Sequence, residues 1–255
     1  MSYKNISMDT LISLVLASLI GWILYREIVP SAVTSPTSSR RRLCDYYAAG
    51  SVFEDVSSAL ARGIRVLEVH LYSDEDDQPV VATTAQTQGH DVAVDNVSFE
   101  SVCVAITNDA FPSSDPCVLS IVPHTEKTIV LNRAAEILQT TVRRHLIKGT
   151  NIHLAPIDSL ADKLILVSGG HIVGSDLEPL INLSWTDTPL RRLTYTQALY
   201  PRDPEELKGF NLNNISLVAA DPDFTPPTLH PNTPAVVYGC QWNFYVSGPG
   251  GFHAK

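Results

Sequence analysis

The stretch ALARGIRVLEVHLYSDEDDQPVV, residues 59–81, decides the fold of this chain. It ends a segment of helical spacing, Val52–Arg62, at a glycine and then alternates branched and polar residues over Ile64–Leu71. That alternation predicts a β-strand. The acidic turn Ser73–Gln78 separates this strand from a second short one, Pro79–Ala82. A helix followed directly by a strand is the repeating unit of α/β proteins.

Helix-like and strand-like stretches alternate along the rest of the chain. The expected helices are Phe99–Ala110, Thr128–Leu146 and shorter pieces at Ala198–Tyr200 and Asp203–Gly209, and the expected strands are Cys117–Val122, Leu164–Val167 and the region Ala235–Val246. The strands carry near-continuous apolar runs, which are typical of parallel strands covered on both faces. About 210 residues suit a compact (β/α) barrel, so we predict an α/β fold with a parallel sheet over residues 43–255.

Composition and charge exclude several classes of protein. The chain has 255 residues, 44% hydrophobic and 18% charged, which excludes a disordered chain and a multi-span membrane protein. Residues 1–42 carry five basic and two acidic side chains, whereas residues 43–255 carry 13 basic and 25 acidic ones, a net charge of −12. Such an acidic body is a poor partner for nucleic-acid phosphates, so we expect no nucleic-acid partner.

The amino end contains sixteen residues without a charge, TLISLVLASLIGWILY, at Thr10–Tyr25. With its apolar flanks this stretch is long enough to cross a hydrocarbon core of about 30 Å as a helix. A cleaved signal peptide is the rival interpretation, although the amino end has only one lysine and no clean A-x-A site follows. We predict an uncleaved anchor over residues 1–29, which would make the chain a single-pass membrane protein.

Residues 30–42 predict a tether between this anchor and the barrel. The run is rich in Ser, Thr and Pro and ends in the triplet Arg40–Arg42. The arginines favour a cytoplasmic carboxyl domain, whereas the four N-x-S sequons favour the opposite side. These sequons are at Asn5, Asn96, Asn182 and Asn214. The orientation in the membrane stays open.

The four cysteines are scattered and form no CxxC pair, so a zinc site of the usual spacing is not expected. Four cysteines are too sparse for a disulfide scaffold, and one or two disulfide bridges stay open.

The order of the motifs resembles eukaryotic phosphoinositide-specific phospholipase C. Residues 59–81 resemble the segment in which a helix, a G-C-R-like turn and a V-E-L-D strand precede an acidic turn. DAFPSSDPCVLSIVPHTEKTIVLNRAAEIL, residues 109–138, resembles that family's A-F-x-x-S-x-x-P-V-I-L-S-L-E-N-H segment with the following helix. The resemblance divides residues 43–255 into an X-like part, 43–167, and a Y-like part, 193–255 that contains Gly-Cys-Gln. It implies a distorted TIM (β/α)8 barrel.

The resemblance also implies a calcium-dependent chemistry that this sequence keeps only in part. Cys44 stands where the first catalytic histidine belongs in the best match to S-H-N-T-Y, and Asp45 keeps an oxygen ligand for Ca²⁺. Glu68 matches the glutamate ligand of V-E-L-D, but His70 replaces the aspartate, and imidazole is a poor calcium ligand. Val122 replaces the glutamate of L-S-L-E-N-H. We therefore expect the Ca²⁺ site of Asp45 and Glu68 to be weak or lost.

The second catalytic histidine of the family lies in a Y-H-G motif. It falls on Thr83 in an ungapped match, or near His90 if the insertion in this loop is placed earlier. The alternative for His90 is a surface histidine in a polar loop. The family's substrate lysines fall on Val167 and Gly169, and the stretch Asp221–Pro227 has no basic residue where a headgroup arginine should lie. No substrate-binding residue is therefore predicted.

Three other constellations carry weaker hypotheses. Ser168-Gly169-Gly170-His171 loosely resembles a glycine turn that cradles phosphate. Cys44 with His70 or His90 is a candidate thiol–imidazole pair, against the simpler interpretation of an inert buried cysteine. The turn Asp74–Asp77 is a candidate for a loose divalent ion, against the simpler interpretation of a solvated turn.

Two hypotheses follow for function. The first is a membrane-anchored phospholipase-C-like barrel with a degenerate active site, acting as a non-catalytic binding or scaffold module for a lipid or protein partner. The second is an active phosphoinositide or lipid phosphodiesterase whose remodelled site uses Glu68, His70 and His90.

Overall fold

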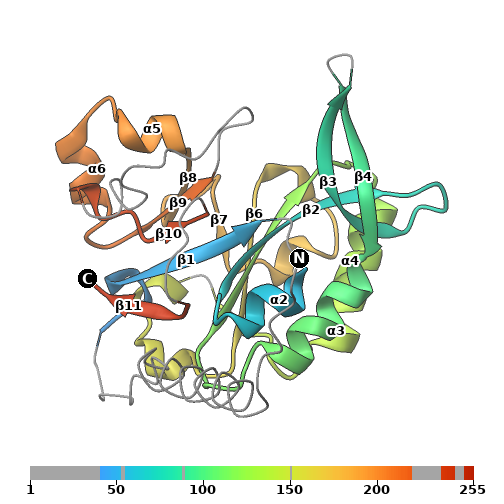
Figure 1. The fold of residues 1–255 in the computed structure, drawn as a ribbon, viewed down its shortest axis with the longest axis horizontal. Coiled ribbons are helices and arrows are strands. Elements are labelled where there is room, and N and C mark those ends of the chain that lie inside the picture. The colour runs from blue at the N-terminus through green and yellow to red at the C-terminus, as the bar shows by residue number, and fades with distance from the viewer. Residues whose placement is uncertain (1–40, 53–54, 88–89, 150, 220–236, 245–249) are drawn as a thin grey trace, which may run out of the picture. The chain divides into compact units, whose positions relative to one another are not determined.

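The computed structural model describes residues 41–52, 55–87, 90–149, 151–219, 237–244 and 250–255, and for residues 83–95 it describes the backbone alone. Eight parallel strands form a nearly closed barrel (Figure 1). In barrel order these strands are β1 (Tyr46–Val52), β2 (Val66–Ser73), β5 (Cys117–Pro123), β6 (Leu164–Ser168), β7 (Leu183–Ser184), β8 (Leu190–Thr194), β9 (Ile215–Ala219) and β10 (Trp242–Asn243). β10 pairs with β1, and within the described residues only the seam between β7 and β8 has no ladder. The predicted α/β fold with a parallel sheet is confirmed.

Helices cover one side of this barrel. They are α2 (Val56–Ala61), α3 (Phe99–Asp109) and α4 (Thr128–Thr141). Two further helices, α5 (Tyr195–Leu199) and α6 (Pro204–Phe210), connect β8 to β9 and lie away from these three (Figure 1). Short 3-10 turns are η1 (Leu43–Asp45), η2 (Ile152–Leu154), η3 (Ile157–Leu160), η4 (Gly170–Ile172) and η5 (Glu178–Leu180). Helix α3 begins after Ser98, whose hydroxyl oxygen accepts a hydrogen bond from the backbone N–H of Ser101 at 3.1 Å. A serine in this position is a preferred helix N-cap.

A long hairpin departs from the regular pattern between β2 and α3. Its strands are β3 (Pro79–Thr87) and β4 (His90–Ser98), and it extends away from the barrel (Figure 1). The sequence predicted only the first four residues of β3 and did not predict β4. A further short strand, β11 (Phe252–Ala254), pairs antiparallel with β1.

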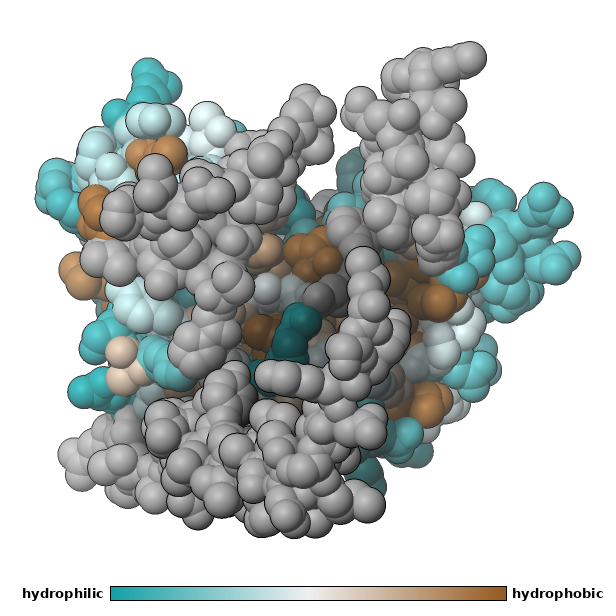
Figure 2. Space-filling model, viewed as in Figure 1, coloured by the Kyte–Doolittle hydropathy of each residue, from teal (hydrophilic) through white to brown (hydrophobic). Residues whose placement is uncertain are grey.

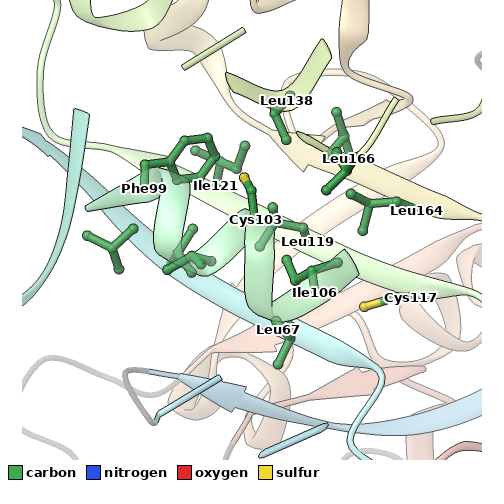
Figure 3. Close-up of a cluster of buried hydrophobic side chains, with 14 of the residues drawn as sticks. Leu67, Phe99, Cys103, Ile106, Cys117, Leu119, Ile121, Leu138, Leu164 and Leu166 are labelled. Carbon is green, nitrogen blue, oxygen red and sulfur yellow. The ribbon is translucent and has the colours of Figure 1, made fainter. Parts of the chain in front are cut away.

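Alternation along the parallel strands creates two cores. Side chains facing outward pack against α3 and α4, as Figure 3 shows for the cluster that contains Leu67, Leu119, Ile121, Leu164 and Leu166 from the strands and Phe99, Ile106 and Leu138 from the helices. Side chains facing inward fill the barrel, among them Val66, Val118, Ile165, Leu217 and Trp242. Because the side-chain period of a strand is two, neighbouring residues of one strand belong to different cores.

Several predicted boundaries were wrong. The predicted helix Val52–Arg62 begins only at Val56, because Val52 is the last residue of β1. The predicted helix Thr128–Leu146 ends at Thr141. In the predicted strand region Ala235–Val246, the described strand is the two-residue β10.

The prediction of a single-pass membrane protein needs correction. Among the helices that the structure describes between residues 41 and 255, none is both long and apolar enough to cross a bilayer. The longest of them, α4, has 14 residues, fewer than the roughly 20 that a span requires. The stretch expected to form the anchor, Thr10–Tyr25, lies outside the described residues.

Of the sequons, Asn182 is buried, and its amide donates hydrogen bonds to the carbonyls of Ile147 and Gly149.

The cysteines provide a test of this burial. All four are free and buried. Burial raises the pKa of Cys103 and Cys117 to about 12 and that of Cys240 to about 11, and it also raises the pKa of Cys44. Because the thiolate is the reactive form, we expect no fast reaction of the native protein with Ellman's reagent at pH 8 and four reactive thiols after unfolding in guanidinium chloride. A thiol that reacts within seconds in the native protein would contradict the described packing.

Candidate functional site

Polar side chains meet inside the barrel at the level where β1 ends. Leu67 and Val69 of β2 face the helices. Because side chains alternate along a strand, Glu68 and His70 face the inside of the barrel. Ser120 of β5 pairs in register with Glu68. Further polar groups come from β8, which lies four strands from β2 in either direction around the barrel. In TIM-type barrels, functional sites lie toward the carboxyl ends of the strands.

Glu68 is the centre of this cluster. Its side chain is 2% exposed, and both carboxylate oxygens have partners. Arg192 of β8 donates from Nη2 to Oε1 at 2.7 Å, and the Ser120 hydroxyl donates to Oε2 at 3.1 Å. Burial alone raises the pKa of Glu68, but the contact with His70 and the charge of Arg192 outweigh it and hold this pKa below its usual value. Glu68 is therefore an anion stabilised from inside the protein.

Two histidines and a tyrosine continue the cluster toward the mouth of the barrel. His70 Nε2 lies 3.6 Å from Glu68 Oε1, and His70 Nδ1 shares a hydrogen bond with His124 Nε2 at 2.8 Å. The His124 ring lies between His70, at a centroid distance of 4.8 Å, and Tyr72, at 4.5 Å and nearly parallel. The result is a chain of contacts from a buried carboxylate through two imidazoles to the surface.

An aromatic side chain holds Arg192 from the other side. The Arg192 guanidinium lies 5.5 Å from the centroid of the Trp185 ring, within the range of a cation–π contact. The Trp185 indole in turn lies directly over Gly169, where any added Cβ would overlap it. The glycine turn Ser168–His171, which was a candidate phosphate cradle, is therefore occupied by a side chain of the protein.

Two cavities flank the barrel. One of about 520 Å³ lies between α2, α3, β2 and β3, with Glu68 in its wall and apolar side chains such as Val56, Val81 and Val102 around it. A larger one of about 1290 Å³ lies against the outer side of α4 and residues 176–182 and contains none of the side chains of the cluster. The smaller cavity is also lined by Leu67 and Val69, which face the helices, so it lies on the outer side of the sheet and not inside the barrel with the side chains of the cluster.

The structure does not bring Cys44 and Asp45 to this cluster. Both belong to η1, before the first residue of β1, whereas Glu68 pairs with Val52 at the last residue of that strand. Seven residues of strand at about 3.3 Å each separate the two levels by roughly 20 Å. Asp45 forms an ion pair with Arg42 at 2.9 Å. The residue of β1 that lies beside Glu68 is Val52.

His90 is also separate from the cluster. It is the first residue of β4 and pairs with Thr87 at the outer end of the hairpin, while the hairpin joins the barrel where Val81 pairs with Leu71. Six residue steps along β3, from Val81 to Thr87, separate these two points by roughly 20 Å of strand. Of the three histidine and cysteine candidates, the structure therefore brings only His70 to Glu68.

The described residues around Glu68 do not fit a calcium ion. Ca²⁺ takes six to eight oxygen ligands, and here Glu68 is the one predicted ligand at the site. His70 and Val122, which pair across β2 and β5, offer it no oxygen. Arg192 also brings a positive charge to a Glu68 oxygen. Across the part of the chain that the structure describes, no group of three or more His, Cys, Asp and Glu side chains is arranged to hold a metal.

The acidic turn after β2 has a structural explanation. Asp77 forms an ion pair with Lys127 at 2.6 Å, and Arg133 of α4 donates to the carbonyls of Asp76 and Asp77. Asp74 accepts hydrogen bonds from two backbone N–H groups of the same turn. Figure 2 shows a hydrophilic projection at the right of the molecule, where the turn between β2 and β3 lies in Figure 1. The turn is fastened to α4 by its own charges.

Sequence reasoning missed Arg192, Trp185 and Ser120. The signals were present but weak: an arginine pair between two leucines in Leu190–Thr194, and a serine inside the buried strand β5. Nothing in the sequence pairs Arg192 with a glutamate 124 positions away.

The family of the chain follows from its sequence. The model of the family "Phosphatidylinositol-specific phospholipase C, X domain" matches residues 41–168, half of the chain. The chain belongs to this family, which confirms the resemblance found in the motifs. No curated protein sequence matches the chain significantly.

Solved structures of phospholipases share the fold. Crystal structures of S. officinalis and L. pealei PLC21 are each 17% identical, with TM-scores of 0.65 and 0.64 over 81% of this chain and 34% of theirs. This chain thus spans about a third of those two proteins. A calcium-dependent phosphoinositol-specific phospholipase C from Pseudomonas sp. is 10% identical, with a TM-score of 0.57 over 87% of this chain and 97% of its own. At these identities the similarity shows the fold alone.

The contact between Gly169 and Trp185 leads to a test by substitution. We expect Gly169→Ala to lower the free energy of unfolding by about 1–3 kcal/mol, because the new methyl group must displace the indole from a packed position. Urea denaturation measures this change. The control Gly209→Ala lies in α6, where an added Cβ meets nothing within 4 Å, and should be neutral or stabilise the helix by up to about 1 kcal/mol. Equal effects of the two variants would contradict the described contact.

Proposed function

We propose that this chain is a phospholipase-C-like barrel that does not hydrolyse phosphoinositides and serves as a binding or scaffold module. The observation that carries the proposal is the dispersal of the expected catalytic residues. Cys44 lies roughly 20 Å below Glu68 along β1, and His90 lies at the outer end of the hairpin. Val52, beside Glu68, has no group that transfers a proton.

The chemistry of phosphodiester cleavage supports the same proposal. The reaction needs a base for the attacking hydroxyl, an acid for the leaving group and a positive charge for the phosphate. A single missing acid or base commonly costs about 10²–10⁴-fold in rate. Here the two described histidines of the mouth, His70 and His124, share a hydrogen bond with each other, and the positive charge of Arg192 is already paired with Glu68.

Charge limits the partner of such a module. Residues 43–255 carry a net charge of −12, which disfavours nucleic acid and strongly anionic lipid headgroups. Among the lipid and protein partners that the sequence left open, a protein with a basic or neutral surface suits this charge better.

A second candidate function rests on a different observation. His70 and His124 share a hydrogen bond beside a buried carboxylate, an arrangement that can move a proton. A remodelled lipid phosphodiesterase would use this pair and Glu68, with His90 playing no part.

Hydrolysis assays separate the two candidates. We expect the purified full chain to release no inositol phosphate from phosphatidylinositol or phosphatidylinositol 4,5-bisphosphate vesicles above a protein-free control, with Ca²⁺ or with EDTA. Release by the unmodified protein that disappears in His70→Ala and persists in His90→Ala would overturn this proposal in favour of the second candidate. Release that persists in both variants would contradict both.

A further inference from the structure

The ion pair between Glu68 and Arg192 spans the inside of the barrel. Glu68 comes from β2 and Arg192 from β8, on opposite walls, and their charged atoms lie 2.7 Å apart. The Glu68 side chain is 2% exposed and the Arg192 side chain 25%, so the pair reaches from the interior toward the mouth. At this depth a carboxylate without a positive partner would cost several kcal/mol of stability.

The surroundings hold the guanidinium in this place. Trp185 covers it at 5.5 Å, and Gly169 gives the indole the space that it fills. Within the described residues, the buried Arg192 Nε has no hydrogen-bond acceptor. Arg192 therefore remains inside although one of its donors is unsatisfied there, which indicates that the attraction of Glu68 and the indole determines its position.

We infer that Arg192 is a built-in cation, which balances the charge of Glu68 in the way that a divalent metal would and makes this site independent of metal. The inference deepens the proposed function and rests on it. A calcium ion at the Glu68 oxygens would have to displace Arg192, and the guanidinium would then lie beside a dication. Like charges at such distances in a buried site repel strongly, so the carboxylate has room for one cation only.

Thermal unfolding of the full chain tests this inference. Arg192→Met should lower the melting temperature in EDTA by about 10 °C, because it leaves a buried carboxylate without its charge partner. The double variant Arg192→Met with Glu68→Gln should recover at least half of that loss, because it removes the buried charge as well. The control Arg191→Met replaces the preceding residue of the same strand, whose pair with Glu206 is exposed, and should lower the melting temperature by no more than about 2 °C.

Calcium chloride is the second probe. The unmodified protein should keep its melting temperature within about 1 °C in 5 mM CaCl2, because its carboxylate already has a cation. Arg192→Met should rise by about 2–4 °C in 5 mM CaCl2 relative to KCl of equal ionic strength, as a millimolar site would, and Arg192→Lys should not. If Arg192→Met does not fold, the double variant and the calcium response of the unmodified protein still decide the matter.

Three results would overturn the inference. They are a calcium-dependent rise in the melting temperature of the unmodified protein, a double variant no more stable than Arg192→Met, and a folded Arg192→Met protein that does not respond to calcium. Metal-independent hydrolysis by the unmodified protein would contradict the proposed function but leave this inference standing, so the two failures are distinguishable.

Discussion

A carboxylate enclosed by a barrel needs positive charge and hydrogen-bond donors within reach, and the described mouth of this protein is arranged around that need. Desolvation of one ion costs several kcal/mol, which is a large part of the stability of a typical domain. Arg192 and Ser120 bond the two oxygens of Glu68, and His70 lies close to one of them. The three partners come from three different strands, so the correct position of each strand depends on the others.

Strand register explains how this arrangement is specified. Leu67 and Val69 enter the outer core with α3, and this fixes Glu68 and His70 to the interior. A shift of β2 by one residue would send Glu68 into the apolar layer under the helices. The hydrophobic contacts on one face therefore hold the charged group on the other face, and the ion pair across the barrel adds a long-range constraint.

The sequence predicts those elements whose pattern is local. The apolar runs of β5 and β6 and the helix expected at Phe99–Ala110 were each placed to within about two residues of the observed bounds. The site was harder, because its contacts join distant parts of the chain. The match to L-C-D-Y-Y drew attention to Cys44, but β1 continues to Val52, and this later residue meets Glu68. Arg192 has no partner that periodicity could reveal, since its counter-charge is 124 positions earlier.

The barrel wall deforms most easily at the seam between β7 and β8, where two neighbouring strands are not hydrogen-bonded to each other. A closed barrel resists widening because each strand is hydrogen-bonded to a neighbour on both sides. Here the facing edges of β7 and β8 have no ladder between them in the described chain, and β7 has only two residues. The circumference can thus widen at this one place without loss of a backbone hydrogen bond between strands. Local opening of the barrel would therefore occur first between β7 and β8, and amide hydrogens of these strands would exchange before those of the other strands.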